Sequence, residues 1–70
     1  MLPLTLVPPG TACTILRVGG SPEIKKHLED LGFNVGTEVS VINSLGENLI
    51  VKVKESRVAV SDELARKIMV

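Results

Sequence analysis

Alternation of apolar and polar positions in the second half of the chain predicts short β-strands. Apolar, mostly β-branched residues recur with a period of two in three runs, 39–41, 50–54 and 57–60. Successive side chains of a strand point to opposite faces, so this period is typical of sheets that bury one face. The connecting turns are predicted at 44–48 and 55–56, and the second is short enough for a tight hairpin.

A different period predicts one α-helix over residues 22–31. The apolar positions recur at i, i+4 and i+7, at Ile24, Leu28 and Leu31, and charged residues fill the other face. Ser21 is a good N-cap, and Pro22 stands at the first helical position, where its missing N–H costs nothing.

Two glycines four positions apart, Gly32 and Gly36, mark the end of this helix and the start of the next strand. Gly32 follows the last periodic residue, where helices commonly end with a residue at positive φ. Phe33 can then fold back onto Leu28 as the hydrophobic contact of a Schellman-type cap. Residues 34–37 are predicted to form a β-turn, with Gly36 at the positive φ of a type II turn.

The first segment, 2–10, contains three prolines and is predicted to be an extended edge that leads into a turn. Residues 11–18 are rich in β-branched types and predict a strand, which Gly19 and Gly20 end.

Near the C-terminus, Ser61 is predicted to cap a short helical turn over 62–67, and 68–70 can return as a last strand. The chain therefore predicts a single domain over 1–70 that is mainly β. Four or five short strands are best closed into a small barrel, which also removes exposed edges.

Composition narrows the function. The 70 residues have a formal net charge of zero and a single aromatic residue. Nucleic acid binding is not expected, since it depends on a basic face and often on stacking aromatic side chains. No apolar run approaches the roughly 20 residues of a membrane-spanning helix. The N-terminus does not resemble a signal peptide, so we expect a cytoplasmic location.

Candidate metal ligands are Cys13 and His27, because thiolate and imidazole bind iron or zinc. Cys13 lies in an apolar strand, where a buried filler is the simpler interpretation. His27 borders the apolar stripe of the helix and is expected to be partly exposed. Adjacent acidic pairs and Gly19–Gly20 provide no shared catalytic site or phosphate loop, so no catalytic residue and no cofactor are expected.

Candidate contact residues lie in turns and at one hairpin. Lys52, Lys54 and Arg57 could face an acidic partner. Leu6, Val35 and Leu45 occupy turn or lead-in positions where no core periodicity requires an apolar residue. If exposed apolar residues gather, they mark a protein-binding surface. The residues alone therefore favour binding of a macromolecule over catalysis.

The order of these features resembles the FeoA family over essentially the entire chain. The most distinctive part is DLGF at 30–33 followed by VGT at 35–37, where the family usually shows DLG, an apolar residue and a PGT-like turn. Val35 replaces the usual proline, which loses some pre-organisation of the turn but keeps Gly36. The resemblance also includes the C-terminal segment RVAVSDELARKIMV.

This resemblance implies an SH3-like barrel of about five strands with an inserted short helix. It also implies a non-enzymatic accessory protein of bacterial ferrous iron uptake that binds the cytoplasmic, GTPase-containing region of the FeoB membrane transporter. The alternative is an iron-sensing or metal-binding regulatory module, similar to the C-terminal domain of iron-dependent repressors and binding Fe²⁺ weakly. A monomer or weak homo-oligomer is expected. The expected partner contacts are Phe33, Asn34, Val35, Leu45, Lys52, Lys54 and Arg57.

Overall fold

The computed structural model describes residues 1–70 and is mainly β. Its elements follow in the order η1 (Leu4–Leu6), β1 (Ala12–Thr14), β2 (Arg17–Val18), α1 (Pro22–Asp30), β3 (Glu38–Leu45), β4 (Asn48–Val53), β5 (Ser56–Ser61), α2 (Asp62–Ala65) and β6 (Ile68–Met69). There are thus six strands rather than about five. Neither α-helix has the length and apolar character needed to cross a bilayer.

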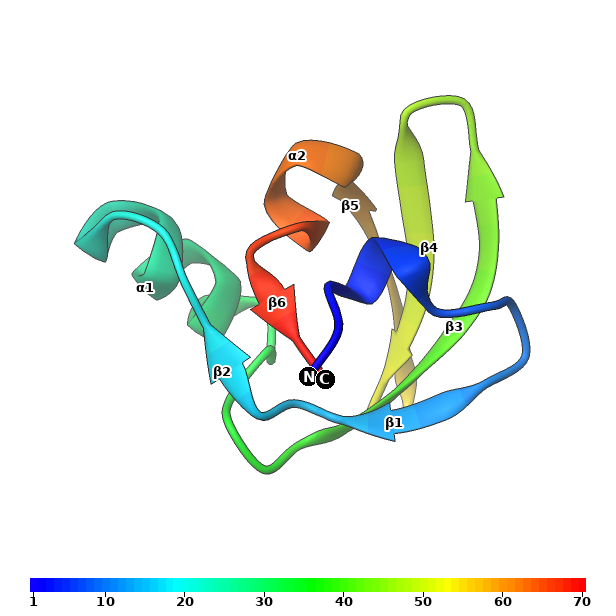
Figure 1. Cartoon of the computed structure of the whole chain (residues 1–70), viewed down its shortest axis with the longest axis horizontal. Coiled ribbons are helices and arrows are strands. Elements are labelled where there is room, and N and C mark those ends of the chain that lie inside the picture. The colour runs from blue at the N-terminus through cyan, green and yellow to red at the C-terminus, as the bar shows by residue number, and fades with distance from the viewer.

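The strands form two antiparallel sheets that share a corner. One has the order β1-β3-β4-β5, and the other pairs β2 with β6. Figure 1 shows β1 running through a bend into β2, so that one continuous segment contributes to both sheets. The chain ends lie side by side, because Leu2 and Val70 exchange backbone hydrogen bonds of 2.8 Å.

The alternation in the sequence correctly predicts the face of the large sheet that is buried. Leu49, Val51 and Val53 of β4 are buried and alternate with more exposed residues, and β3 buries Val39 and Val41 in the same way. These residues belong to one core of fourteen apolar side chains that contains no buried polar residue. The residues that alternate with them point to the outer face of the sheet.

Helix α1 begins and ends as its sequence predicts, within one residue. The Ser21 hydroxyl accepts a hydrogen bond from the Ile24 N–H at 3.3 Å, and Leu28 is fully buried. At the C-terminus Gly32 has φ +103°, and its N–H donates to the Glu29 carbonyl at 2.9 Å. Together with a bond from the Phe33 N–H to the Leu28 carbonyl, also 2.9 Å, this is the Schellman motif.

The turn that follows is also confirmed. The Thr37 N–H donates to the Asn34 carbonyl at 3.0 Å, and Gly36 has φ +89°. The Gly36 N–H donates to the Ile15 carbonyl, and the Ile15 N–H donates to the Thr37 carbonyl. The turn is therefore anchored to the bend between β1 and β2.

The strand expected over 11–18 is wrong in one respect, because it is divided into β1 and β2. At the division the backbone changes partner: Ile15 bonds to Thr37, whereas the next N–H, of Leu16, donates to the Met69 carbonyl. A change of partner between two sheets requires the chain to bend, and the composition of the segment does not encode that partner.

The lead-in also differs from the extended edge that was expected. Leu4–Leu6 forms a 3-10 turn, in which the Leu6 N–H donates to the Pro3 carbonyl and the Val7 N–H to the Leu4 carbonyl. Pro3 still lies in an isolated bridge with Met69. The turn lets Leu4 and Val7 both reach the core.

The second half of the chain has longer strands than expected. β3 extends to Leu45, so the expected turn over 44–48 shrinks to two residues between Leu45 and Asn48. The Ser61 hydroxyl caps α2 by accepting from the Leu64 N–H at 3.3 Å, and α2 ends at Ala65 rather than near residue 67. The expected removal of exposed edges is incomplete, because β5 stands last in its sheet.

Candidate functional site

A row of polar side chains crosses the outer face of the large sheet. The strand register places Ser40 opposite Lys52, and Lys52 opposite Arg57. Both cations are exposed, and the row lies on the face opposite the buried Val51 and Val53. Like charges directly opposite one another destabilise a sheet. The row is therefore suited to an anionic group, which would relieve that repulsion.

A shallow hollow adjoins this row and is lined only by polar residues, Thr37, Glu38, Ser40, Lys52 and Lys54. We call it the hairpin hollow. Lys54 occupies the turn between β4 and β5 with φ +58°, the only non-glycine residue at positive φ. The hollow presents two ammonium groups, one carboxylate and two hydroxyls, which is a hydrogen-bonding surface rather than an apolar pocket.

The loop after α1 ends beside the same end of the sheet. A Cβ on Gly32 would lie 3.1 Å from Cγ1 of Val53, the last residue of β4. In the turn that follows, Asn34 is exposed and the residue Val35 is 65% exposed. Because Thr37 both closes this turn and lines the hairpin hollow, Asn34 and Val35 belong to the same end of the molecule.

Leu45 does not lie at the same end of the molecule as Asn34, Val35 and the hairpin hollow. It is 61% exposed, but it lies at the far end of β3, next to the β3–β4 turn. A strand rises about 3.3 Å per residue, so Leu45 lies roughly 23 Å along β3 from Glu38 at the hollow. One small partner surface does not include both ends.

Phe33 is not available for contact, contrary to expectation. Its side chain is fully buried in the core. The physical reason is the helix cap: the bond from the Phe33 N–H to the Leu28 carbonyl turns the residue back toward the domain. The neighbouring Val35 is the apolar residue of this loop that reaches the surface.

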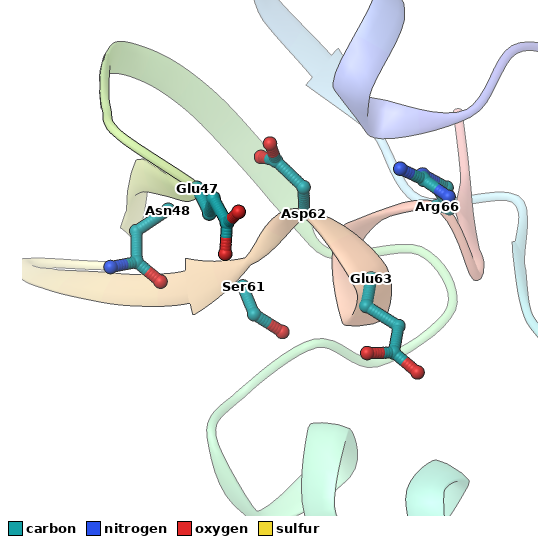
Figure 2. Close-up of a pocket in the computed structure, with 6 residues that line it drawn as sticks. All are labelled: Glu47, Asn48, Ser61, Asp62, Glu63 and Arg66. Carbon is teal, nitrogen blue, oxygen red and sulfur yellow. The ribbon is translucent and has the colours of Figure 1, made fainter.

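A second hollow lies at the opposite end of the sheet, between the β3–β4 turn and α2. It is lined by Glu47, Asn48, Ser61, Asp62, Glu63 and Arg66. Figure 2 shows the three carboxylates pointing in different directions rather than toward one point. The backbone closes this end, because the Asp62 N–H donates to the Glu47 carbonyl at 2.8 Å. The arrangement has acidic character without the geometry of a chelating site.

The two candidate metal ligands lie on different elements. Cys13 is half-buried in β1, opposite Val39, whereas His27 is exposed on α1. Burial, and to a smaller extent the negative charge of Glu38, raises the pKa of the Cys13 thiol above its ordinary value, so the thiolate that metals bind is disfavoured. No group of three or more His, Cys, Asp or Glu side chains is placed to hold a metal ion.

Sequence reasoning missed part of both hollows. Glu38 and Ser40 are on the outer face because they alternate with the buried Val39 and Val41, and this signal was present in the sequence. Glu47 and Asp62 come from segments 15 residues apart, and nothing local indicates that they meet. The register of β4 against β5 brings them together.

The matches to known proteins agree with this architecture. The FeoA domain family matches residues 2–70. The chain belongs to the FeoA family. A crystal structure of an iron uptake regulatory protein (FeoA) superposes with a TM-score of 0.88 at 24% identity, covering 96% of this chain and 91% of that one. No curated protein sequence matches the chain.

A FeoA protein from Stenotrophomonas maltophilia, crystallised with zinc and described as a prokaryotic SH3 domain protein, has a TM-score of 0.81 at 28% identity. The match covers 94% of this chain and 85% of that one. The fold of this FeoA-family chain is thus SH3-like, as the resemblance to that family implies. Part of a manganese-dependent transcriptional repressor has the same fold, with a TM-score of 0.83, 16% identity and coverage of 93% of this chain and 38% of the repressor.

Proposed function

We propose that this protein is a non-enzymatic accessory of ferrous iron uptake that binds the cytoplasmic, GTPase-containing region of a FeoB-type transporter. The observation that supports it most is the match of the FeoA family to residues 2–70. Family and fold are consistent with an accessory role in ferrous iron transport. The proposed partner places the protein in the cytoplasm.

The proposed contact surface is the hairpin hollow with its neighbours. Lys52 and Lys54 line the hollow, and Val35 is exposed at the same end of the sheet. An apolar side chain beside a small group of charges can bury area, while the charges orient the partner and raise the rate of encounter. Because Lys52 faces Arg57 across the strands, an acidic segment of the partner would relieve the repulsion between them.

Binding can be tested by NMR titration of the isotope-labelled protein with the GTPase region of the transporter from the same organism. We expect shifts confined to residues around the hairpin hollow and the turn 34–37. The double variant Lys52→Glu/Lys54→Glu should weaken binding at least about tenfold, which corresponds to about 1.4 kcal/mol. Lys25→Glu/Lys26→Glu, on the exposed face of α1, is the matched control for charge and should bind normally.

An unchanged spectrum at saturating transporter fragment contradicts the proposed function. Binding that the double variant and the control weaken equally contradicts the proposed surface but leaves the partner in place.

The metal-sensing alternative is supported by the shared fold of the repressor domain. It predicts stoichiometric binding of ferrous iron that Cys13→Ser abolishes. Anaerobic titration with ferrous iron alone separates the two functions: shifts around Cys13 and His27 without the transporter would favour the sensor. Because no group of three or more His, Cys, Asp or Glu side chains is placed to hold a metal ion, we expect no stoichiometric site.

A further inference from the structure

Strand β5 has one paired edge and one free edge. It is the last strand in the order β1-β3-β4-β5, and the short sheet of β2 and β6 does not extend to it. Val58 lies on the inner face of the sheet, opposite the fully buried Val51, yet it is only half-buried. In Figure 1, α1 lies at the left of the view, β5 lies behind β4, and α2 stands at the end of β5.

The backbone groups that point away from the sheet can be identified from the register. In an antiparallel pair, every second residue exchanges hydrogen bonds with its partner strand. The two-residue turn makes Val53 and Ser56 such a pair, and the bond from Asp62 to Glu47 fits the same series. Val58 and Val60 therefore bond to β4, whereas Arg57 and Ala59 direct their N–H and C=O groups outward. Ser61 directs its N–H outward, but its C=O accepts the first hydrogen bond of α2, of which it is the N-cap.

The outward groups of Arg57 and Ala59 have no partner within the chain. None of the backbone bonds outside the regular elements involves Arg57 or Ala59, and both residues are exposed. Natural proteins protect free edges with proline, lysine or bulges, because an open row of N–H and C=O groups is a template for another strand. The sequence of β5, SRVAVS, contains no proline and no lysine, and Arg57 is its only charged residue.

The charges at the two ends of β5 determine which strand fits. Arg57 lies opposite Lys52 at one end, so that end is basic. At the other end, Ser61 lines the acidic hollow together with Glu47, Asp62 and Glu63. A second strand with the same distribution of charge, paired antiparallel, would place its basic end against the acidic end of β5. Its acidic end would then lie against the basic end of β5.

We propose that the free edge of β5 is a self-association site, where β5 of a second copy of this chain pairs antiparallel about a two-fold axis through Ala59. In this register Arg57 of each copy lies opposite Ser61 of the other, next to the acidic hollow. The central Ala59 pair provides two backbone hydrogen bonds and each Arg57–Ser61 pair provides one, from the Ser61 N–H to the Arg57 carbonyl, so about four new bonds form. The two large sheets become one continuous sheet, and Val58 packs beside Val60 of the second copy.

Other registers fit less well. Moving the axis to Arg57 places two guanidinium groups opposite each other, which destabilises the pair. Moving it to Ser61 requires pairing by α2, which is helical. The net charge of zero also means that no overall repulsion separates two copies.

Sedimentation equilibrium of the chain alone, over about 10 μM to about 1 mM, tests this pairing. We expect a reversible monomer–dimer equilibrium. Ala59→Pro removes the central outward N–H of each copy, and a proline is tolerated where the N–H faces solvent at an edge. Arg57→Glu places a carboxylate against the acidic hollow. Each should raise the dissociation constant at least about tenfold.

Exchanging the charges of Arg57 and Glu63 is a more specific test of the proposed register. Adding Glu63→Arg to Arg57→Glu should restore dimerisation, whereas Lys26→Glu, the same change of charge on α1, should leave it unaltered. Far-UV circular dichroism verifies that each variant is folded.

A monomer at every concentration overturns the proposal, as does a dimer that Arg57→Glu and Ala59→Pro do not weaken. Because the transporter is absent from this experiment, its outcome is independent of the proposed function.

Discussion

The Phe33 N–H donates to the carbonyl oxygen of Leu28 at 2.9 Å, and the side chains of both residues are fully buried. This pairing ends α1 and at the same time directs the chain into the turn that exposes Val35. The core and the proposed contact surface therefore depend on one cap, in which Gly32 supplies the positive φ.

Replacing Gly32 tests this cap. Gly32→Val should lower the free energy of unfolding by more than about 2 kcal/mol, because a β-branched residue is strained at positive φ and its Cβ would crowd Val53 at 3.1 Å. Gly36→Val is the control, since Gly36 also has positive φ, +89°, but open space around its Cβ, and this variant should cost less than Gly32→Val. Urea denaturation of the variants measures both, and equal losses would contradict the added role of crowding.

Phe33 separates stability from binding. Phe33→Leu should lower the free energy of unfolding by about 1–2 kcal/mol, because it leaves part of a fully buried volume unfilled. Binding of the transporter fragment should be unchanged once the folded fraction is taken into account. Val35→Asp should do the opposite, with normal stability and weakened binding. If the folded Phe33→Leu variant binds the transporter fragment more weakly, Phe33 contributes to the contact surface and the prediction is wrong.

Lys54 holds an unfavourable backbone conformation that glycine would relieve. With φ +58° in the β4–β5 turn, Lys54→Gly should raise the free energy of unfolding by up to about 1 kcal/mol. Lys52→Gly, two residues earlier within β4, should lower it instead, since glycine weakens a strand interior. Thermal melts of the two variants should shift in opposite directions, and a destabilised Lys54→Gly would show that the lysine side chain stabilises the turn.

The Cys13 thiol makes stability depend on alkaline pH. Burial and the charge of Glu38 raise its pKa above the ordinary value of 9.0, so the folded protein holds this proton more tightly than the unfolded chain. The free energy of unfolding should therefore fall as the pH rises from about 9 through the raised native value. Cys13→Ala should lack this part of the fall, which urea melts at about pH 8 and about pH 10 would measure.

Reactivity provides an independent check of the same thiol. Alkylation of native Cys13 at about pH 8 should be slower than that of the unfolded chain, because less thiolate is present. Glu38→Gln should accelerate it. If native and unfolded rates are equal, the thiol is neither buried nor shifted.

Local signals determined the elements that depend on neighbouring residues. Ser21, Pro22 and Gly32 are sufficient to bound α1, because capping and positive φ act within one helical turn. The glycine turn at 34–37 and the alternation around Val51 and Val53 were predicted for the same reason. These features identified the mainly β class and the resemblance to the FeoA family before any contact was known.

Tertiary structure decided which residues meet. The division of 11–18 into β1 and β2 arises because Ile15 bonds to Thr37 and Leu16 to Met69, partners more than 20 residues away. The register of β3 against β4 likewise placed Ser40 opposite Lys52, 12 residues later, and left Leu45 at the far end of β3 from the hairpin hollow.

Phe33 is a residue for which the sequence predicted one feature correctly and the tertiary structure decided another. The sequence predicted that Phe33 takes part in the helix cap. Only the structure shows that a residue in this cap is buried in the core and therefore cannot contact a partner. A period of two identifies the two faces of a strand, whereas the pairing of strands is a property of the whole chain. The sequence by itself therefore determined the elements and their faces, and the packing of the two sheets determined the surface, because that surface is assembled from separate strands.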